Sequence, residues 1–109
     1  MKFTELEEFS KDYKKLCRKY PSLPTDLNLR QEVLAMFPTG RGNDAVQIPG
    51  LKIKSKIFKT RLMCRSVKGK SFRLIYHYDD VRQEIILIEL YFKGDKELED
   101  RDRLFNNFS

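Results

Sequence analysis

The stretch IFKTRLMCRSVKGKSFRLIYHYDDVRQEIILIELYF, residues 57–92, decides the fold of this chain. Apolar and polar residues alternate along three segments of it, with the period of two that is typical of β-strands. The turn-forming residues of 68–71 and 79–83 separate these segments. The pattern therefore predicts an antiparallel three-stranded meander, in which one face covers a core and the other face is polar and cationic.

The alternation also assigns side chains to the faces of this predicted sheet. The polar face is expected to carry Arg73, Ile75 and His77 on the second strand and Glu89, Tyr91 and Lys93 on the third. The core face of the third strand is expected to carry Ile86, Ile88, Leu90 and Phe92. Lys59 and Arg61 of the first strand belong to the polar face where the register allows it.

Helical periodicity flanks the strands on both sides. Thr4 and Glu7 have the spacing of a capping box, which predicts that a first helix opens there. Asp26 is a suitable N-cap for a second helix, so the two form a helical hairpin, and Asp95 is expected to cap a last short helix. Residues 1–109 thus form one α+β domain: an N-terminal helical hairpin packed on a three- to four-stranded antiparallel sheet, with a short C-terminal helix.

Length and composition set the limits for function. The chain has 109 residues, of which 40% are apolar, enough for one domain with a real core. No run approaches the ~20 apolar residues of a membrane span, and the acidic N-terminus does not resemble a signal peptide, so we expect a cytoplasmic protein without a membrane partner. Cys17 and Cys64 lack metal-ligand spacing and there is one histidine, so we expect no metal and no other cofactor.

The net charge of +6 is concentrated in the middle of the chain. Between Arg41 and Tyr76 the sequence has ten basic residues and one acid, Asp44. A solvated surface normally mixes the two signs, so this segregation favours a binding site for a polyanion. The candidate nucleic-acid-binding residues are Lys52, Lys54, Lys56, Lys59, Arg65, Lys68, Lys70 and Lys96.

The polar face has the residue types that RNA cleavage requires. Attack by a 2′-hydroxyl needs a cationic group on the phosphorane and groups that carry protons. The candidate catalytic residues are Arg61, Arg73, Lys93, Tyr91, His77 and Glu89. Three of them have a structural alternative: His77 as a packed or surface residue, Glu89 as the ion-pair partner of Arg61 or Arg73, and Tyr91 as sheet packing.

Several segments resemble the RelE/ParE toxin family. KDYKKL (11–16) resembles its opening helix, and LYFKGDKE (90–97) resembles its last strand with the segment that follows. FKTRL (58–62), followed by GKSFRLIY (69–76), resembles its central hairpin, where a YKxR…gyRxxY pattern recurs. The likeness spans nearly the whole chain, and the order of helices and strands agrees with it.

This resemblance implies the toxin of a bacterial toxin–antitoxin pair, with a cognate antitoxin as partner. In the RelE branch the activity is metal-independent cleavage of mRNA on the ribosome, so the ribosome and mRNA are expected partners. In the ParE branch the toxin inhibits DNA gyrase without nuclease activity, and that branch is the alternative for this chain. A third alternative is a catalytically silent RNA-binding member.

The family's catalytic cations match positions of this chain. Lys59 and Arg61 match the two cations of the first central strand, Arg73 matches the arginine of the hairpin motif, and Lys93 matches the lysine after the last strand. The chain departs from the pattern at two positions. Gly94 stands where the family usually has arginine, with Lys96 as the nearest cation. The C-terminal catalytic tyrosine has no clear match, and Phe105 or Phe108 lies near its position.

Overall fold

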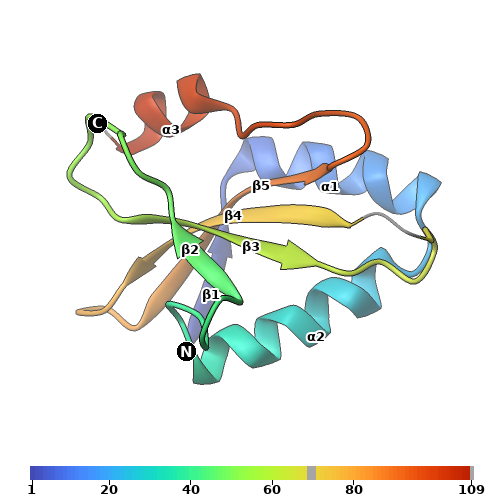
Figure 1. Cartoon of the computed structure of the whole chain (residues 1–109), viewed down its shortest axis with the longest axis horizontal. Coiled ribbons are helices and arrows are strands. Elements are labelled where there is room, and N and C mark those ends of the chain that lie inside the picture. Colours follow the sequence, from blue (N-terminus) through green and yellow to red (C-terminus); the bar gives the residue numbers. More distant parts are fainter. Residues whose placement is uncertain (69–70, 109) are drawn as a thin grey trace.

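The chain folds into the expected α+β class, and the order of its elements can be followed in the computed structural model, which describes residues 1–68 and 71–108 (Figure 1). Along the chain the elements are β1 (Lys2–Glu5), α1 (Glu7–Lys19), α2 (Leu23–Met36), β2 (Ala45–Gln47), β3 (Ile57–Leu62), β4 (Phe72–Asp79), β5 (Glu84–Phe92) and α3 (Arg101–Phe108). None of the helices in these residues has the length and apolar character that crossing a membrane requires.

The sheet contains the predicted meander but is larger than expected. Its strand order is β1-β5-β4-β3-β2, and β1 runs parallel to β5 while the other neighbours are antiparallel. The sheet is therefore five-stranded and mixed, and the prediction of a three- to four-stranded antiparallel sheet was wrong in this respect. β1 is added because the edge of β5 offers its backbone groups as partners to residues 2–5.

The expected capping box at the N-terminus was also wrong. Thr4 lies in β1 opposite Ile86, and its hydroxyl donates a hydrogen bond to Glu84 at 3.0 Å. α1 begins only at Glu7, after Leu6, whose backbone N–H donates to the Leu87 carbonyl. Of the two residues with the spacing of a capping box, Thr4 thus lies in the strand and Glu7 is the first residue of the helix.

The two helices α1 and α2 cover one face of the sheet, with a three-residue connection between them. Aromatic and leucine side chains fill this interface, and the largest of those with almost no exposure are Phe9, Leu23, Leu34, Phe72, Leu74 and Tyr76. Tyr76 donates its hydroxyl proton to the Pro38 carbonyl at 2.8 Å, so its polar end is satisfied inside the core. The alternation of β4 was predicted correctly: Phe72, Leu74 and Tyr76 share this face.

α3 covers part of the opposite face, which was expected to be polar and open (Figure 1). A second buried cluster lies there, composed of Ile48, Ile57, Ile75, Ile88, Tyr91 and Leu104. Leu51, Ile53 and Phe108 pack around it, so the segment before β3 and the C-terminal helix together close over the middle of the sheet. On this face of the sheet the cationic side chains therefore lie mainly toward the ends of the strands, because isoleucines occupy the central positions.

A β-bulge in β5 changes which residues share a face. Ile75 of β4 is paired with Glu89 but the next residue, Tyr76, is paired with Leu87, so Ile88 is an extra residue. As a result Ile88 lies in the cluster under α3, whereas Leu90 lies in the cluster under α1 and α2. The prediction that Ile86, Ile88, Leu90 and Phe92 share one face was wrong for this reason.

The starts of the last two helices differ from the prediction as well. α2 begins at Leu23, next to a proline that fits the first turn, and Asp26 is a buried residue inside that turn rather than its N-cap. α3 begins at Arg101 and not near Asp95. Asp100 caps this helix: its Oδ1 accepts the backbone N–H of Arg103 at 3.1 Å, and its own backbone N–H donates to Glu89 at 2.7 Å.

Candidate functional site

Arg61, Arg73 and Tyr91 form a row across three neighbouring strands. Arg61 of β3 is the direct partner of Arg73 of β4, and Arg73 is in turn the partner of Tyr91 of β5. Arg61 is exposed, Arg73 is partly exposed, and Tyr91 is buried with 6% of its surface accessible. We call these three residues the arginine row.

The two arginines of this row face each other without a carboxylate. Like charges in directly opposed strand positions destabilise a sheet. Arg73 donates to the Ser71 hydroxyl at 2.5 Å and to the Phe72 carbonyl at 3.3 Å, and both of these acceptors are neutral. Within residues 1–68 and 71–108, neither guanidinium has an ion-pair partner. This arrangement is suited to an anionic ligand that supplies the missing charge.

Lys93 lies at the same end of the sheet as the arginine row. Its backbone N–H donates to the carbonyl of Ser71 at 3.1 Å, and the hydroxyl of the same serine accepts a hydrogen bond from Arg73. Its side chain is exposed and donates to the Glu97 carbonyl at 3.0 Å. Four of the six candidate catalytic residues, three cations and Tyr91, are therefore brought to one end of the strands.

Tyr91 contributes a buried hydroxyl to the row. No hydrogen-bond partner for this hydroxyl is found in the described part of the chain. Burial raises the pKa of Tyr91 to about 12, and the negative charges of Glu99 and Glu89 act in the same direction, against the opposing charge of Arg73. The phenol is therefore neutral at neutral pH, and its hydroxyl is closed off from solvent.

Other candidate cations are paired with buried carboxylates. Lys59 Nζ lies 2.7 Å from Glu99, and Arg65 Nε lies 3.2 Å from Asp26. Lys96 forms an ion pair with Glu89, whose side chain is 3% exposed. We call Lys59, Arg65 and Lys96 the paired cations. A buried carboxylate balances each of these charges, so they attract an outside anion less strongly than Arg61 and Arg73 do, whose charges are unpaired in the described residues.

Glu89 and Glu99 have roles that differ from those expected. Glu89 was considered as a partner of Arg61 or Arg73, but it pairs with Lys96. Glu99 stands in a charged run that was interpreted as solvated surface, yet it is 5% exposed. Although burial opposes ionisation, the Lys59 ammonium and the Arg101 guanidinium hold the pKa of Glu99 below its usual range. Nothing in the alternation of 95–103 distinguishes Glu99 from its exposed neighbours, so sequence reasoning missed it.

The remaining candidate nucleic-acid residues are distributed on both sides of β3. Lys52, Lys54 and Lys56 are exposed on the segment before that strand, at the end far from Arg61. Lys68 is exposed on the segment after it. Lys70 lies outside the described residues. The lysines before β3 therefore do not extend the arginine row directly.

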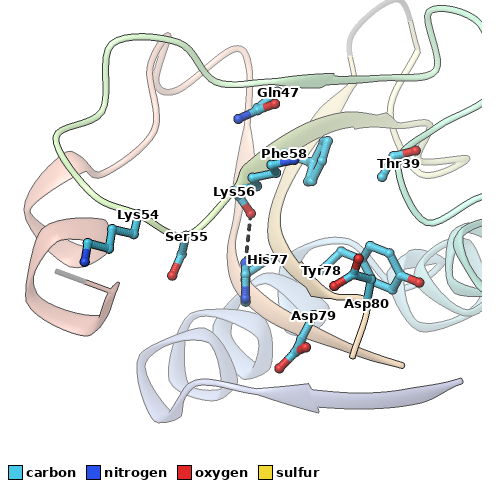
Figure 2. Close-up of a pocket in the computed structure, with 10 residues that line it drawn as sticks. All are labelled: Thr39, Gln47, Lys54, Ser55, Lys56, Phe58, His77, Tyr78, Asp79 and Asp80. Atoms are coloured by element: carbon cyan, nitrogen blue, oxygen red, sulfur yellow. Dashed lines mark hydrogen bonds between the residues drawn. The ribbon is translucent and has the colours of Figure 1, made fainter. Parts of the chain in front are cut away.

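His77 is separated from the arginine row. It lies four residues from Arg73 along β4, which corresponds to about 13 Å of strand. Its Nδ1 is 2.8 Å from the Lys56 carbonyl, and its ring packs against Phe108 of α3 at 5.4 Å between centroids. Figure 2 shows His77 in a cleft of about 600 Å³ at the other end of β4. The expectation that His77 shares a site with Arg73 was therefore wrong, although both project from one face.

The described residues were also compared with metal-binding clusters, and the chain with known protein families. Among the described residues, no three His, Cys, Asp or Glu side chains are close enough to hold a metal ion. No protein-family model matches the chain, and no curated protein is significantly similar to it. The arrangement of the arginine row itself is therefore the basis for a functional assignment.

Proposed function

We propose that this chain is the toxin of a bacterial toxin–antitoxin pair and that it cleaves ribosome-bound mRNA without a metal ion. The observation that carries the proposal is the pair of opposed arginines, Arg61 and Arg73, without a carboxylate and next to the buried Tyr91 hydroxyl. A phosphodiester supplies the charge and the oxygens that this row lacks. The RelE/ParE resemblance supports RNA as the source of that phosphodiester.

The arginine row suits the charge that develops when a 2′-hydroxyl attacks its phosphate. The guanidinium groups of Arg61 and Arg73 bind the non-bridging oxygens and neutralise the phosphorane. Lys93, at the same end of the sheet, adds positive charge. Tyr91 is protonated at neutral pH, and its buried ring lies beside Arg73 on the neighbouring strand. Glu89, whose oxygens are bonded by Lys96 and Asp100, positions the segment after β5 rather than moving a proton.

A surface on α2 and β3 supports an antitoxin as partner. A groove of about 270 Å³ there is lined by Leu29, Val33 and Met63, and the exposed fractions of Leu29 and Met63 are 52% and 61%. Arg30 also lines it, together with the Arg65–Asp26 ion pair. Exposed apolar side chains beside the Arg30 guanidinium suit an amphipathic, acidic helix, which we expect to bury on the order of 1,500 Å² in total.

Induced expression in bacteria tests the function. We expect growth arrest, and primer extension on cellular mRNA is expected to detect new 5′ ends. Arg73→Ala should abolish both and reduce cleavage by ~100-fold or more, because it removes a donor that stabilises the transition state. Arg18→Ala, an exposed arginine of α1, is the matched control and should retain the arrest.

Two outcomes distinguish the alternatives. His77→Gln should cost little activity, because His77 lies outside the arginine row. Growth arrest that survives Arg73→Ala, together with gyrase-dependent DNA breaks and intact mRNA, would establish the ParE-like gyrase inhibitor instead. Wild-type protein that accumulates without any arrest would contradict both forms of the toxin proposal.

A further inference from the structure

A second site is suggested by the cleft around His77, at the end of the sheet opposite to the arginine row (Figure 2). It lies where β3 begins and β4 ends. Its volume is about 600 Å³, within the range of small-molecule sites. The cleft is lined by Thr39, Gln47, Lys54, Ser55, Lys56, Phe58, His77, Tyr78, Asp79 and Asp80.

One wall of the cleft offers hydrogen-bond acceptors. Asp79 uses Oδ1 to accept the backbone N–H groups of Val81 and Arg82, both at 3.1 Å, which fixes its side chain in the turn after β4. The other oxygen of Asp79 and the carboxylate of Asp80 have no partner among the described residues. The carboxylates of Asp79 and Asp80 thus line this wall, and that of Asp79 is held in place by the backbone.

His77 adds a third acceptor to the cleft. A carbonyl only accepts, so the Nδ1 atom that contacts the Lys56 carbonyl carries the hydrogen, and in the neutral ring Nε2 has the free lone pair. Packing against Phe108 holds the ring. In Figure 2 the second ring nitrogen points away from Lys56, toward the side of the cleft on which Asp79 lies.

The opposite wall offers hydrogen-bond donors. It comes from the segment before β3 and from β2, with the exposed ammonium groups of Lys54 and Lys56, the Ser55 hydroxyl and the Gln47 amide (Figure 2). The ring of Tyr78 lines the cleft from the other face of β4, where it packs against the cluster under α1 and α2. A ligand that fits this cleft therefore has donors on one edge and acceptors on the other.

We propose that this cleft binds the guanine base of a nucleotide. Guanine has two adjacent donors, N1–H and the 2-amino group, which match a carboxylate, and two acceptors, O6 and N7, on its other edge. Asp79 and Asp80 take the donors, and Lys54 and Ser55 bond O6 and N7. Adenine, cytosine and uracil each turn at least one lone pair of the pairing edge toward the carboxylates, which is repulsive.

This proposal does not depend on the proposed function, because the cleft is separate from the arginine row. If the chain does cleave RNA, the cleft gives it a base preference at a nucleotide distant from the cleaved bond. The two sites are expected to respond to different substitutions, which makes their tests distinguishable.

Titration calorimetry of the full chain with mononucleotides tests the proposal. GMP should bind at sub-millimolar concentration, and IMP, which lacks the 2-amino group, should bind about tenfold more weakly. AMP and UMP should be weaker than IMP. The backbone amides of Lys56, His77 and Asp79 should shift in the NMR spectrum on addition of GMP.

A matched pair of variants locates the binding. Asp79→Asn keeps the Oδ1 acceptor of the turn but replaces the free oxygen by a donor, and it should weaken GMP at least about tenfold. Asp102→Asn, on the exposed face of α3, should leave binding unchanged. Circular dichroism establishes that each variant is folded.

Three results would overturn the proposal. Equal affinity for all four nucleotides would mean that only the phosphate is bound, and no binding of GMP at millimolar concentration would mean that the cleft has another role. Loss of GMP binding in Arg73→Ala with retention in Asp79→Asn would place the nucleotide on the arginine row. None of these results decides whether the chain cleaves RNA, which the growth and primer-extension experiments test.

Discussion

Two groups of cations that lie on the same strands and segments differ in what surrounds them. Lys59, Arg65 and Lys96 each contact a carboxylate whose side chain is at most 3% exposed. Arg61 and Arg73 contact none in the described residues, although they stand opposite each other in the sheet. In the sequence four of these five cations belong to one basic stretch between Arg41 and Tyr76, and Lys96 lies outside it.

The difference shows that a neighbouring buried carboxylate determines whether a Lys or Arg side chain stabilises the fold or stays unpaired. Burying a carboxylate costs free energy unless a cation pairs with it. Asp26, Glu89 and Glu99 therefore each require their cationic partner for stability. Arg61 and Arg73 pair with no buried acid among the described residues, and the repulsion between them is reduced when an anion binds. Substitutions in either group, and of the buried acids, test this division.

The largest effect is expected for RNA affinity in the Arg61→Ala/Arg73→Ala variant. Loss of two phosphate contacts should weaken binding of a single-stranded RNA about 100-fold at low salt, and it should reduce the slope of log K against log salt by ~1.4. Fluorescence anisotropy at several salt concentrations measures both quantities.

Arg65→Ala/Lys96→Ala is the matched control for this experiment. It also removes two positive charges, but these are paired cations, so the salt slope should stay near the wild-type value while the thermal midpoint falls. An equal reduction of the slope in both variants would show that the paired cations also bind RNA, and the division between the two groups would then be wrong.

A smaller effect is expected for stability when a buried acid is removed. Although burial opposes ionisation, the Ser22 hydroxyl and the backbone and side chain of Arg65 hold the pKa of Asp26 below its usual range. Asp26→Ala should therefore lower the free energy of unfolding at pH 7 by about 2 kcal/mol. Urea unfolding measures this difference, and Asp102→Ala, an exposed acid of α3, should change it little.

The pH dependence of this difference has a defined sign. Because the pKa of Asp26 is lower in the folded state, its contribution is present above the unfolded pKa of about 4 and is lost as the pH falls through the folded value. The stability of wild type and Asp26→Ala should thus converge in acid. A difference that stays constant down to pH 2 would mean that the Asp26 carboxylate is not what stabilises the turn.

The fold was predictable where a local pattern determines it. The alternation in 57–62 and 72–79 gave the correct faces for β3 and β4, since each side chain of a regular strand has its side fixed by the pleat. The alternation failed in β5, because the extra residue Ile88 makes a bulge that depends on pairing with β4. β1 was missed for a similar reason: residues 2–5 become a strand only through the edge of β5.

The candidate site was predictable in part. Strand alternation and the basic pattern selected Arg61, Arg73 and Tyr91, which the register brings into one row. The same alternation wrongly joined His77 to them, because it gives the face of a side chain and not its place along the strand, where four residues correspond to about 13 Å. Glu99 was missed, because its burial depends on the position of Lys59 in a distant part of the chain.

The smallest effect concerns the opposed arginines themselves. Arg61→Ala removes one of two like charges and should raise the free energy of unfolding by about 0.5 kcal/mol at low salt, while it weakens RNA binding severalfold. Arg61→Lys keeps the charge and should not be stabilised, and added salt should reduce the gain by screening. Denaturant unfolding of the three proteins without RNA measures the effect. A clear loss of stability in Arg61→Ala would mean that its side chain stabilises the sheet, and the arginine row would then be a structural feature rather than a site kept for an anion.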